Sequence, residues 1–314
     1  MSTPNAPPDP AVERFRGDLN AVGGATGTIV VAVSGGSDSL ALLALAAAAI
    51  PGRVLACTVD HALRSASASE AEQVEAMCHA LNVHHVTARV QVNPHGNLSD
   101  QARAARYTAL DTVRVQHGAQ WIATAHHADD QRETIVMRLN RGAGIGGLAG
   151  IRRRNRCVLR PLLGWTRAEL AEVVAAAGLN PLDDATNRDV RFDRARLRIA
   201  LQDVDWLDAR AVARSARYCD EAAEALDWAA ARIEPSAAVM ADLPDELVRR
   251  VLLHQICRVN PNADPGMAQL ARLAVIVQRG RTGMLADVVC TPGPVWTFAL
   301  APPRRAAAIP PARP

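Results

Sequence analysis

The chain has 314 residues but no lysine, so arginine supplies all 35 of its basic side chains. Without lysine, the common phosphate-binding motif G-x-x-x-x-G-K-[ST] is excluded. Arginine suits phosphate binding, although a biased genome composition would produce the same set. The formal net charge is only +3, and clustering of charge indicates a nucleic-acid partner better than the total does. Aromatic residues make up 3% of the chain, so alanine and aliphatic side chains fill much of its core.

The sequence also lacks closely spaced cysteines and long apolar runs. Its six cysteines lie at least 21 positions apart, which excludes a Cys-x-x-Cys metal ribbon or dithiol motif and indicates buried thiols in a reducing compartment. The proline-rich start has no apolar signal core, and the longest apolar run, Leu40 to Ile50, is too short to span a membrane. We therefore expect a cytoplasmic protein with no membrane partner. The sequence leaves its assembly state open, a homodimer included.

Strand-like and helix-like segments alternate through the first half of the chain. We expect strands at 28–33, 54–59, 83–90 and 120–124, and helices at 38–49, 69–81, 98–117 and 129–139. The alternation predicts an α/β fold with a parallel sheet flanked by helices, in which ligands bind at the carboxyl ends of the strands. Thr166 to Glu169 matches a capping box that opens a further helix. Five glycines between 142 and 150 argue against a helix there.

The segment Ser34–Ser39, with the sequence SGGSDS, follows an apolar run and opens a helix. Its glycines let backbone N–H groups approach a phosphate, and the helix N-terminus adds partial positive charge. Ser37 and Ser39 can donate hydroxyl hydrogen bonds, and Asp38 can bind a metal ion. The pattern SGGxDS resembles the PP-loop of ATP pyrophosphatases, which cleave ATP between its α and β phosphates. An ordinary strand-to-helix turn is the alternative, and this context disfavours it.

A second informative segment, HHADDQRET at 126–134, begins at a strand end and runs into a helix. On a helix, His126 and Asp130 share one face, as do Asp129 and Glu133. Histidines beside carboxylates suggest a metal site or proton transfer. No H-E-x-x-H motif or nearby cysteine supports zinc, whereas carboxylates that face an ATP site suit Mg²⁺. A solvated polar helix start is the alternative.

An ordered series of segments resembles the tRNA(Ile)-lysidine synthetases, a family of PP-loop enzymes. The segments are SGGSDS at 34–39, VDHALR at 59–64, ARAARY at 102–107, TAHHADDQRET at 124–134, RGAGIGGLAG at 141–150, RPLL at 160–163 and DATN at 184–187. The chain departs from the family pattern at Ala195, where the family usually has asparagine. The arginines of that pattern on either side of it, Arg194 and Arg198, are intact.

The resemblance implies a ligase that joins L-lysine to carbon 2 of the wobble cytidine in the isoleucine tRNA with a CAU anticodon, forming lysidine. ATP and Mg²⁺ adenylate the base with release of pyrophosphate, and AMP leaves when the lysine amine attacks. It also implies a PP-loop catalytic domain followed by a small helical domain. We expect an N-terminal extension, disordered or helical, at 1–25, the ATP-binding domain at 26–204, the helical domain with a C-terminal hairpin at 205–301 and a disordered tail at 302–314. Within the second domain we expect helices at 205–233, 244–258 and 267–279, and hairpin strands at 284–291 and 295–301.

The same resemblance assigns roles to particular residues. The expected catalytic residues are Asp38, His126, Asp130 and Arg106, with Asp38 and Asp130 as metal ligands. The expected nucleotide-binding residues are Ser34, Gly35, Gly36, Ser37, Asp38, Ser39, Asp60 and His61. The residues expected at lysine or tRNA are Arg103, Glu133, Arg152, Arg153, Arg154, Arg194 and Arg198. For the arginines, a merely solvated charged face is the alternative.

Two other functions compete with this interpretation. The first is another PP-loop enzyme that modifies tRNA or adenylates a small molecule. Sulfur transfer usually involves paired or persulfide-carrying cysteines, and none lies near the motifs; a glutamine-dependent synthetase would need an amidotransferase domain. The second is a binding module without catalysis, which would have no need of Asp38, Asp130 and Glu133.

Overall fold

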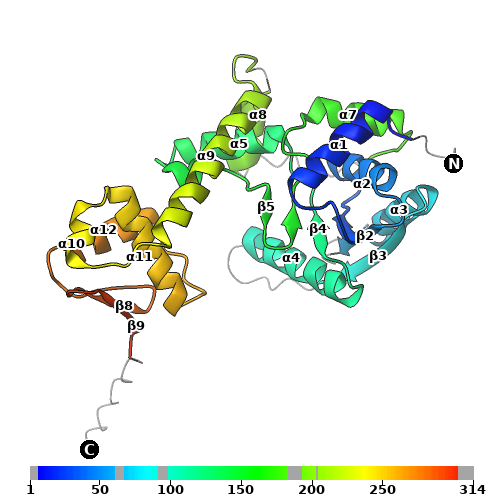
Figure 1. Ribbon diagram of the computed structural model, residues 1–314. Helices are drawn as coiled ribbons and strands as arrows, with labels where there is room; N and C mark the ends of the chain where they lie inside the picture. Colours follow the sequence, from blue (N-terminus) through cyan, green and yellow to red (C-terminus); the bar gives the residue numbers. More distant parts are fainter. Residues whose placement is uncertain (1–5, 61–66, 91–97, 183–192, 203, 303–314) are drawn as a thin grey trace, which may run out of the picture. The chain divides into compact units, whose positions relative to one another are not determined.

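The computed structural model describes residues 6–60, 67–90, 98–182, 193–202 and 204–302 (Figure 1). The chain divides into two compact units, Met1–Cys219 and Asp220–Pro314, and the division falls inside helix α9 (Ala209–Ala230). The domain boundary expected before residue 205 precedes this helix and stays a prediction, and the expected tail at 303–314 lies outside the described residues. Within the described residues, no helix has both the length and the apolar character needed to cross a membrane.

A six-stranded, mostly parallel sheet forms the centre of the first unit. Its strands lie in the order β3-β2-β1-β4-β6-β5, and only β5 runs antiparallel to its neighbour. The bounds are β1 (Ile29–Ala32), β2 (Val54–Asp60), β3 (His84–Arg89), β4 (Trp121–Ala123), β5 (Arg154–Asn155) and β6 (Val158–Leu159). The four strands predicted from the sequence are confirmed, as is the α/β fold class. The sequence did not indicate β5 and β6, because a strand of two residues is too short to show the alternation of apolar and polar side chains that identifies a strand.

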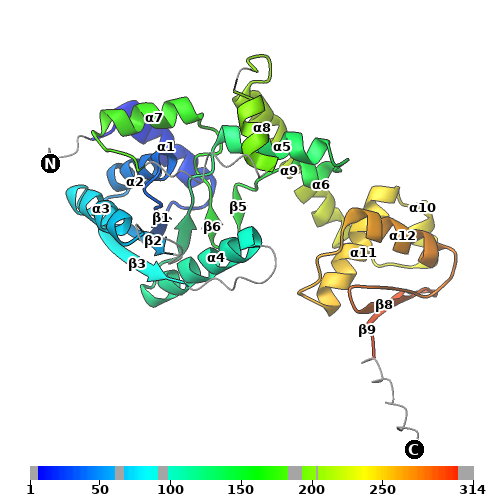
Figure 2. The ribbon, with the colours of Figure 1, turned by 180° about the vertical axis from the view of Figure 1, so that it is seen from behind.

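Helices cover both faces of this sheet (Figures 1 and 2). One face carries α1 (Asp9–Ala21), α2 (Ser37–Ala49), α3 (Ser67–Ala80) and α7 (Arg167–Ala176), and the other carries α4 (Leu98–Gln116). Strand β1 serves both cores, because successive strand residues point to opposite faces. Ile29 and Val31 pack in the core that contains α2, whereas Val30 packs in the core that contains α4.

Three further helices follow the carboxyl ends of the strands: α5 (Ala128–Leu139), α6 (Ile145–Leu148) and α8 (Asp193–Ala200). The expectation that the glycine-rich segment holds no helix was wrong, because α6 is a single helical turn within it. The carbonyl of Gly144 accepts hydrogen bonds from the N–H groups of Gly147 and Leu148. Arg138 on α5 donates to the carbonyls of Gly147 and Gly150. These side-chain bonds offset the entropy that glycine loses in a helix.

The second unit packs α10 (Ala237–Asp242), α11 (Asp245–Val259) and α12 (Met267–Gln278) against a small sheet. The predicted helices at 244–258 and 267–279 are confirmed, and the helical stretch expected at 205–233 contains α9. One buried cation joins α11 to the C-terminal part of α9. Arg250 is 6% exposed, and its guanidinium donates to Glu246 and Asp227.

The C-terminal sheet has three strands where the sequence predicted two. Strands β7 (Gly283–Leu285), β8 (Val288–Thr291) and β9 (Thr297–Leu300) pair antiparallel in that order. The hairpin of β8 and β9 is confirmed, but the expected strand at 284–291 was wrong, because it turns at Ala286 and Asp287. Both residues have positive φ, at 51° and 59°. The turn therefore has the backbone that normally attracts glycine and asparagine, and neither residue type stands at these two positions.

The predicted capping box at the start of α7 is confirmed. Thr166 accepts from the backbone N–H of Glu169, and the Glu169 carboxylate accepts from the N–H of Thr166. The same carboxylate pairs with Arg14 on α1 and Arg210 on α9. One glutamate therefore ties three helices of the first unit together.

Replacing Glu169 with glutamine is expected to reduce stability in neutral solution but not in acid. Burial alone would raise the pKa of Glu169, but Arg210, Thr166 and Arg14 outweigh it and lower the pKa from 4.5 to about 2. The stabilisation is therefore complete above pH 4.5 and disappears as the pH falls through 2. We expect Glu169→Gln to lower the free energy of unfolding by about 2 kcal/mol at pH 6, after solvent screening is allowed for. Urea unfolding at a series of pH values measures this, and a difference independent of pH would contradict it.

Candidate active site

The loop between β1 and α2 has the backbone of a phosphate cradle. Gly35 has φ of +84°, and a Cβ atom there would lie 2.6 Å from Leu182 Cδ1, so a larger residue does not fit. The Leu182 N–H donates to the Gly35 carbonyl at 3.0 Å, which fixes the loop from its other side. The N-cap residue of α2, Gly36, provides no side-chain cap. The N-terminus of α2 is therefore open to an anion.

Ser39 holds this loop in shape. Its side chain is buried; the hydroxyl donates to the Gly36 carbonyl at 2.8 Å and accepts from the Ser34 N–H at 3.2 Å. Ser34 is exposed and Ser37 is half-buried. Direct contact of these residues with a nucleotide stays a prediction, and for Ser39 the structure shows an internal role in addition.

His127 is the side chain on which three carboxylates converge. Its Nε2 atom lies 3.4 Å from Asp38 Oδ2 and 3.5 Å from Asp130 Oδ2, and its Nδ1 atom lies 3.5 Å from Asp129 Oδ2. The imidazole is only 1% exposed. The start of α5 is therefore in direct contact with the cradle at the start of α2. Sequence reasoning missed His127, because two adjacent histidines look alike until the first residue of the helix is known.

The charges in this cluster stabilise one another. Burial alone would lower the pKa of His127, but Asp129, Asp38 and Asp130 outweigh it and raise the pKa to about 9. Burial alone would raise the pKa values of Asp38 and Asp129, and His127 reverses both shifts. Asp38 and Asp129 are therefore ionised at neutral pH, although they lie close together.

Two arginines of α8 cover the carboxylates of α5. Arg194 donates to Asp130 Oδ1 and to Glu133 Oε2, both at 2.9 Å, and Arg198 donates to Glu133 Oε1 at 2.8 Å. Glu133 is 2% exposed. Burial would raise its pKa, but Arg198 and Arg194 lower it. The structure thus brings Asp130, Glu133, Arg194 and Arg198 together in an alternating set of carboxylates and guanidinium groups.

His126 lies near the ion pairs of α5 and α8 but is not part of helix α5. Helix α5 begins at Ala128, so the expectation that His126 and Asp130 share a helical face was wrong. The Nδ1 atom of His126 is 2.9 Å from Thr124 Oγ1. Burial lowers the pKa of His126 to about 3; Asp130 opposes this, while Arg160, Arg103 and Arg194 add to it. The imidazole is therefore neutral at physiological pH.

Comparison with known proteins identifies the family. Residues 13–204 match the PP-loop domain family. A tRNA(Ile)-lysidine synthase from Zymomonas mobilis is 38% identical over 304 residues, which are 90% of this chain and 92% of that protein. The chain belongs to the tRNA(Ile)-lysidine synthase family. A relative of the same name from Novosphingobium aromaticivorans is 38% identical over 312 residues, covering 94% and 95% of the two chains.

A solved structure supports the PP-loop fold. The U34-tRNA thiolase NcsA from Methanococcus maripaludis superposes with a TM-score of 0.54 at 15% identity, over 66% of this chain and 78% of that one. At this identity the likeness concerns the fold alone. The strand–loop–helix that carries SGGSDS therefore lies in a PP-loop domain by sequence and by structure.

Two carboxylates of this PP-loop domain lie close enough together to suit a single magnesium ion. Asp38 and Asp130 approach the same atom, His127 Nε2, so their carboxylates lie on one side of the imidazole. Mg²⁺ is commonly held by one or two carboxylates together with substrate phosphates. Among the described residues, no group of three or more histidine, cysteine or acidic side chains is arranged to hold a metal ion. The donor set therefore suits an ion whose remaining ligands are phosphate oxygens and water.

The glycine-rich loop of the synthase fold is fixed by α5. The buried Gln131 side chain donates to the carbonyls of Ala149 and Ile151 and accepts from the Ile151 N–H. Behind this loop, Arg152 and Arg153 are half-buried, and Arg154 is exposed and stacks on Trp121 at 4.5 Å. The structure thus places these three arginines together on and beside strand β5. Their contact with tRNA stays a prediction.

The remaining predicted residues lie at the same edge or further out. Asp60 ends β2, next to β1, and is 8% exposed; His61 lies outside the described residues. Arg103 and Arg106 are exposed on α4, and Arg103 is close enough to lower the pKa of His126. Within the described residues, no ion pair joins Arg106 to Asp38 or Asp130.

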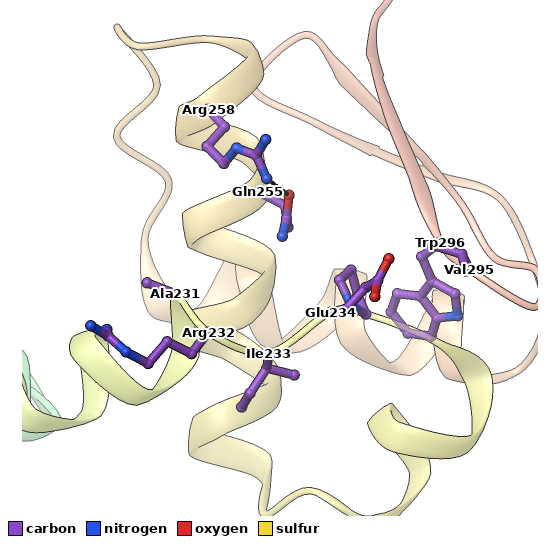
Figure 3. A pocket seen from close by; sticks show the side chains of 9 residues that line it. Ala231, Arg232, Ile233, Glu234, Gln255, Arg258, Val295 and Trp296 are labelled. Atoms are coloured by element: carbon purple, nitrogen blue, oxygen red, sulfur yellow. Dashed lines mark hydrogen bonds between the residues drawn. The ribbon is translucent and has the colours of Figure 1, made fainter.

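A cavity in the second unit contains none of the predicted site residues. It has a volume of about 370 Å³ and lies between the end of α9, helix α11 and the turn before β9 (Figure 3). Arg232, Gln255, Arg258 and Trp296 are among its lining residues. All of its lining residues belong to the second unit.

Proposed function

We propose that this chain is a ligase that forms lysidine. In two steps, ATP adenylates the carbonyl oxygen at carbon 2 of the wobble cytidine of the CAU-anticodon isoleucine tRNA, and the side-chain amine of L-lysine then displaces AMP from that carbon. Family membership over nearly the whole chain supports the reaction class. The observation that carries the proposal is the contact between the cradle and α5, where Asp38 and Asp130 meet at His127.

The cradle and the carboxylates have different functions in this proposal. Backbone N–H groups at the start of α2, with Ser34 and Ser37, bind the triphosphate. Asp38 would hold Mg²⁺, which would offset the charge that develops on the leaving pyrophosphate. Of the two carboxylates that fit the ion, we assign Asp130 to lysine. The cytoplasm, with its supply of ATP and charged metabolites, is the compartment in which we expect this reaction.

The alternating set on α5 and α8 matches both ends of an amino acid. Asp130 and Glu133 attract the ammonium groups of lysine, and Arg194 and Arg198 attract its carboxylate. Because these four side chains already pair with one another, lysine binds by exchanging ion pairs rather than by filling an empty charged pocket. Such exchange lowers the desolvation cost and favours a ligand with charges of both signs.

The neutral ring of His126 is the group best placed to accept a proton from the attacking amine. Its low pKa reflects burial and the neighbouring cations. Phosphate groups that bind beside those cations would raise the pKa, because opposite charges favour the protonated form. His126 would then become a stronger base only when the nucleotide substrates are bound.

Incubation of the protein with ATP, Mg²⁺, labelled lysine and total tRNA tests the function. We expect label in tRNA, with one pyrophosphate and one AMP released for each lysine joined. Omission of any single component should abolish incorporation. If pyrophosphate is released with tRNA but no lysine is incorporated, the alternative PP-loop tRNA modification would be favoured. Adenylation of a small molecule without tRNA would contradict the proposal.

Changing Arg152, Arg153 and Arg154 together to glutamine is expected to weaken tRNA binding and flatten its salt dependence. Each lost phosphate contact lowers the slope of log K against log salt by about 0.7 to 0.9. Filter binding of isoleucine tRNA across a salt series measures the slope, and ATP binding should stay unchanged as the internal control. An unchanged slope would mean that the three arginines form only a solvated face.

A further inference from the structure

The imidazole of His127 stands between two carboxylates that serve different substrates in the proposed function. Nε2 is 3.4 Å from Asp38 at the cradle and 3.5 Å from Asp130 at the α5–α8 ion pairs. The two distances are nearly equal. Asp38 lies in the first turn of α2 and Asp130 in the first turn of α5, so the imidazole connects two helix starts that are remote in sequence.

Nε2 carries at most one hydrogen, and it has two acceptors. If Nε2 donates a full hydrogen bond to Asp38, it has no hydrogen left for Asp130, and if it donates to Asp130, it has none left for Asp38. In the structure neither ring nitrogen has a hydrogen bond of regular geometry. The Nε2 donor is therefore committed to neither carboxylate, and both lie within 3.5 Å of it.

The ring cannot turn away from this shared position. Its other nitrogen, Nδ1, faces Asp129 at 3.5 Å. Asp129 is itself fixed, because its Oδ1 accepts from Arg132 and its Oδ2 accepts from the Arg167 N–H at 2.8 Å. The backbone N–H of His127 donates to Asp130 Oδ2 at 3.2 Å. These contacts hold the ring and the carboxylates in place from both sides.

We propose that His127 is a positioning residue that couples the nucleotide site to the lysine site; this rests on the proposed function. When nucleotide and metal engage Asp38, the Nε2 hydrogen is donated wholly to Asp130 and orients that carboxylate for the lysine ammonium. When lysine engages Asp130 first, the hydrogen is donated to Asp38 and orients it for the metal. Hydrogen bonds from neighbouring residues to metal-binding carboxylates commonly change affinity by about 10-fold to 100-fold.

The coupling must be reciprocal, because it is a difference of binding free energies. A saturating nucleotide should tighten lysine binding, and saturating lysine should tighten nucleotide binding by the same factor. We expect a factor of about 5 to 10, near the low end of couplings measured between sites. A merely structural role for His127 would weaken both sites and leave this factor unchanged.

Two substitutions distinguish the contributions of the two ring nitrogens. In His127→Gln, the amide nitrogen takes the place of Nε2 but carries two hydrogens, so it can serve both carboxylates at once. In His127→Asn, the amide nitrogen takes the place of Nδ1, so Asp129 keeps its partner while Asp38 and Asp130 lose theirs. Both variants should therefore lose the coupling, and only His127→Asn should also bind each ligand more weakly. His117→Gln, at an exposed position beyond the end of α4, is the matched control and should keep the wild-type factor.

The experiment is calorimetric titration of L-lysine, with and without saturating Mg²⁺ and α,β-methylene ATP, in the absence of tRNA so that no reaction occurs. We expect a coupling factor of about 5 to 10 for the wild type and the control, and a factor of one for the His127 variants. Circular dichroism establishes which variants are folded, and either folded variant suffices. A wild-type factor of one, or a folded His127 variant that keeps the wild-type factor, would overturn the inference. A wild-type protein that binds neither lysine nor the nucleotide would instead contradict the proposed function.

Discussion

Replacing Asp38 with alanine is expected to lower tRNA-dependent pyrophosphate release by about a thousandfold, the usual order for removal of one group that stabilises transition-state charge. Asp38 lies in the first turn of α2, directly after the cradle, and its carboxylate contacts His127. The change removes the proposed metal ligand but no core side chain, so the fold should persist. Measurement of pyrophosphate with ATP, Mg²⁺ and tRNA, before lysine is added, isolates the adenylation step.

Asp245→Ala provides the matched control for this prediction. Asp245 is also an aspartate in the first turn of a helix, α11, but it is exposed and lies in the second unit. Its loss should cost only a few tenths of a kcal/mol of stability and leave pyrophosphate release unchanged. If folded Asp38→Ala protein releases pyrophosphate at a near-normal rate, Asp38 has no role in binding the metal.

The second large effect is expected at Asp130. Asparagine has the same shape but cannot balance an ammonium group, so Asp130→Asn should raise the KM for lysine on the order of 50-fold, as for loss of a charged hydrogen-bond partner. Arg194 would also lose one of its two carboxylate partners. Selectivity should fall with affinity, so that ornithine competes better in the variant than in the wild type. Steady-state incorporation of labelled lysine into tRNA measures both quantities.

Asp208→Asn is the control for this change, because Asp208 is exposed and its side chain accepts a local bond from the Ala211 N–H, which asparagine can also accept. It should leave the KM for lysine unaltered. The proposal would be contradicted if Asp130→Asn also left the KM for lysine unaltered and the wild type accepted arginine or ornithine as readily as lysine. Asp130 and Glu133 would then not recognise lysine.

The elements that could be predicted were those whose signal is local. Strand β1, the cradle and helix α2 follow one another within a few residues, and each has its own pattern: β-branched residues, paired glycines and a long apolar run. The capping box of α7 is equally local, since Thr166 and Glu169 are three residues apart. Where a local signal was weak, prediction failed. The turn at Ala286 and Asp287 has no glycine, and α6 is a single glycine-rich turn whose Gly147 carbonyl accepts from the distant Arg138.

The sequence by itself determined the fold class, the phosphate cradle and the family resemblance, because these depend on residue types at fixed short spacing. Only the tertiary structure decided which charges meet. His127 contacts Asp38, and Arg194 contacts Glu133, across long separations in the chain that parallel strands and α8 bring to one edge. Electrostatic energy depends on distance in space and on burial. The protonation of His126 and His127, and the coupling that we infer for His127, therefore belong to the fold and not to any one motif.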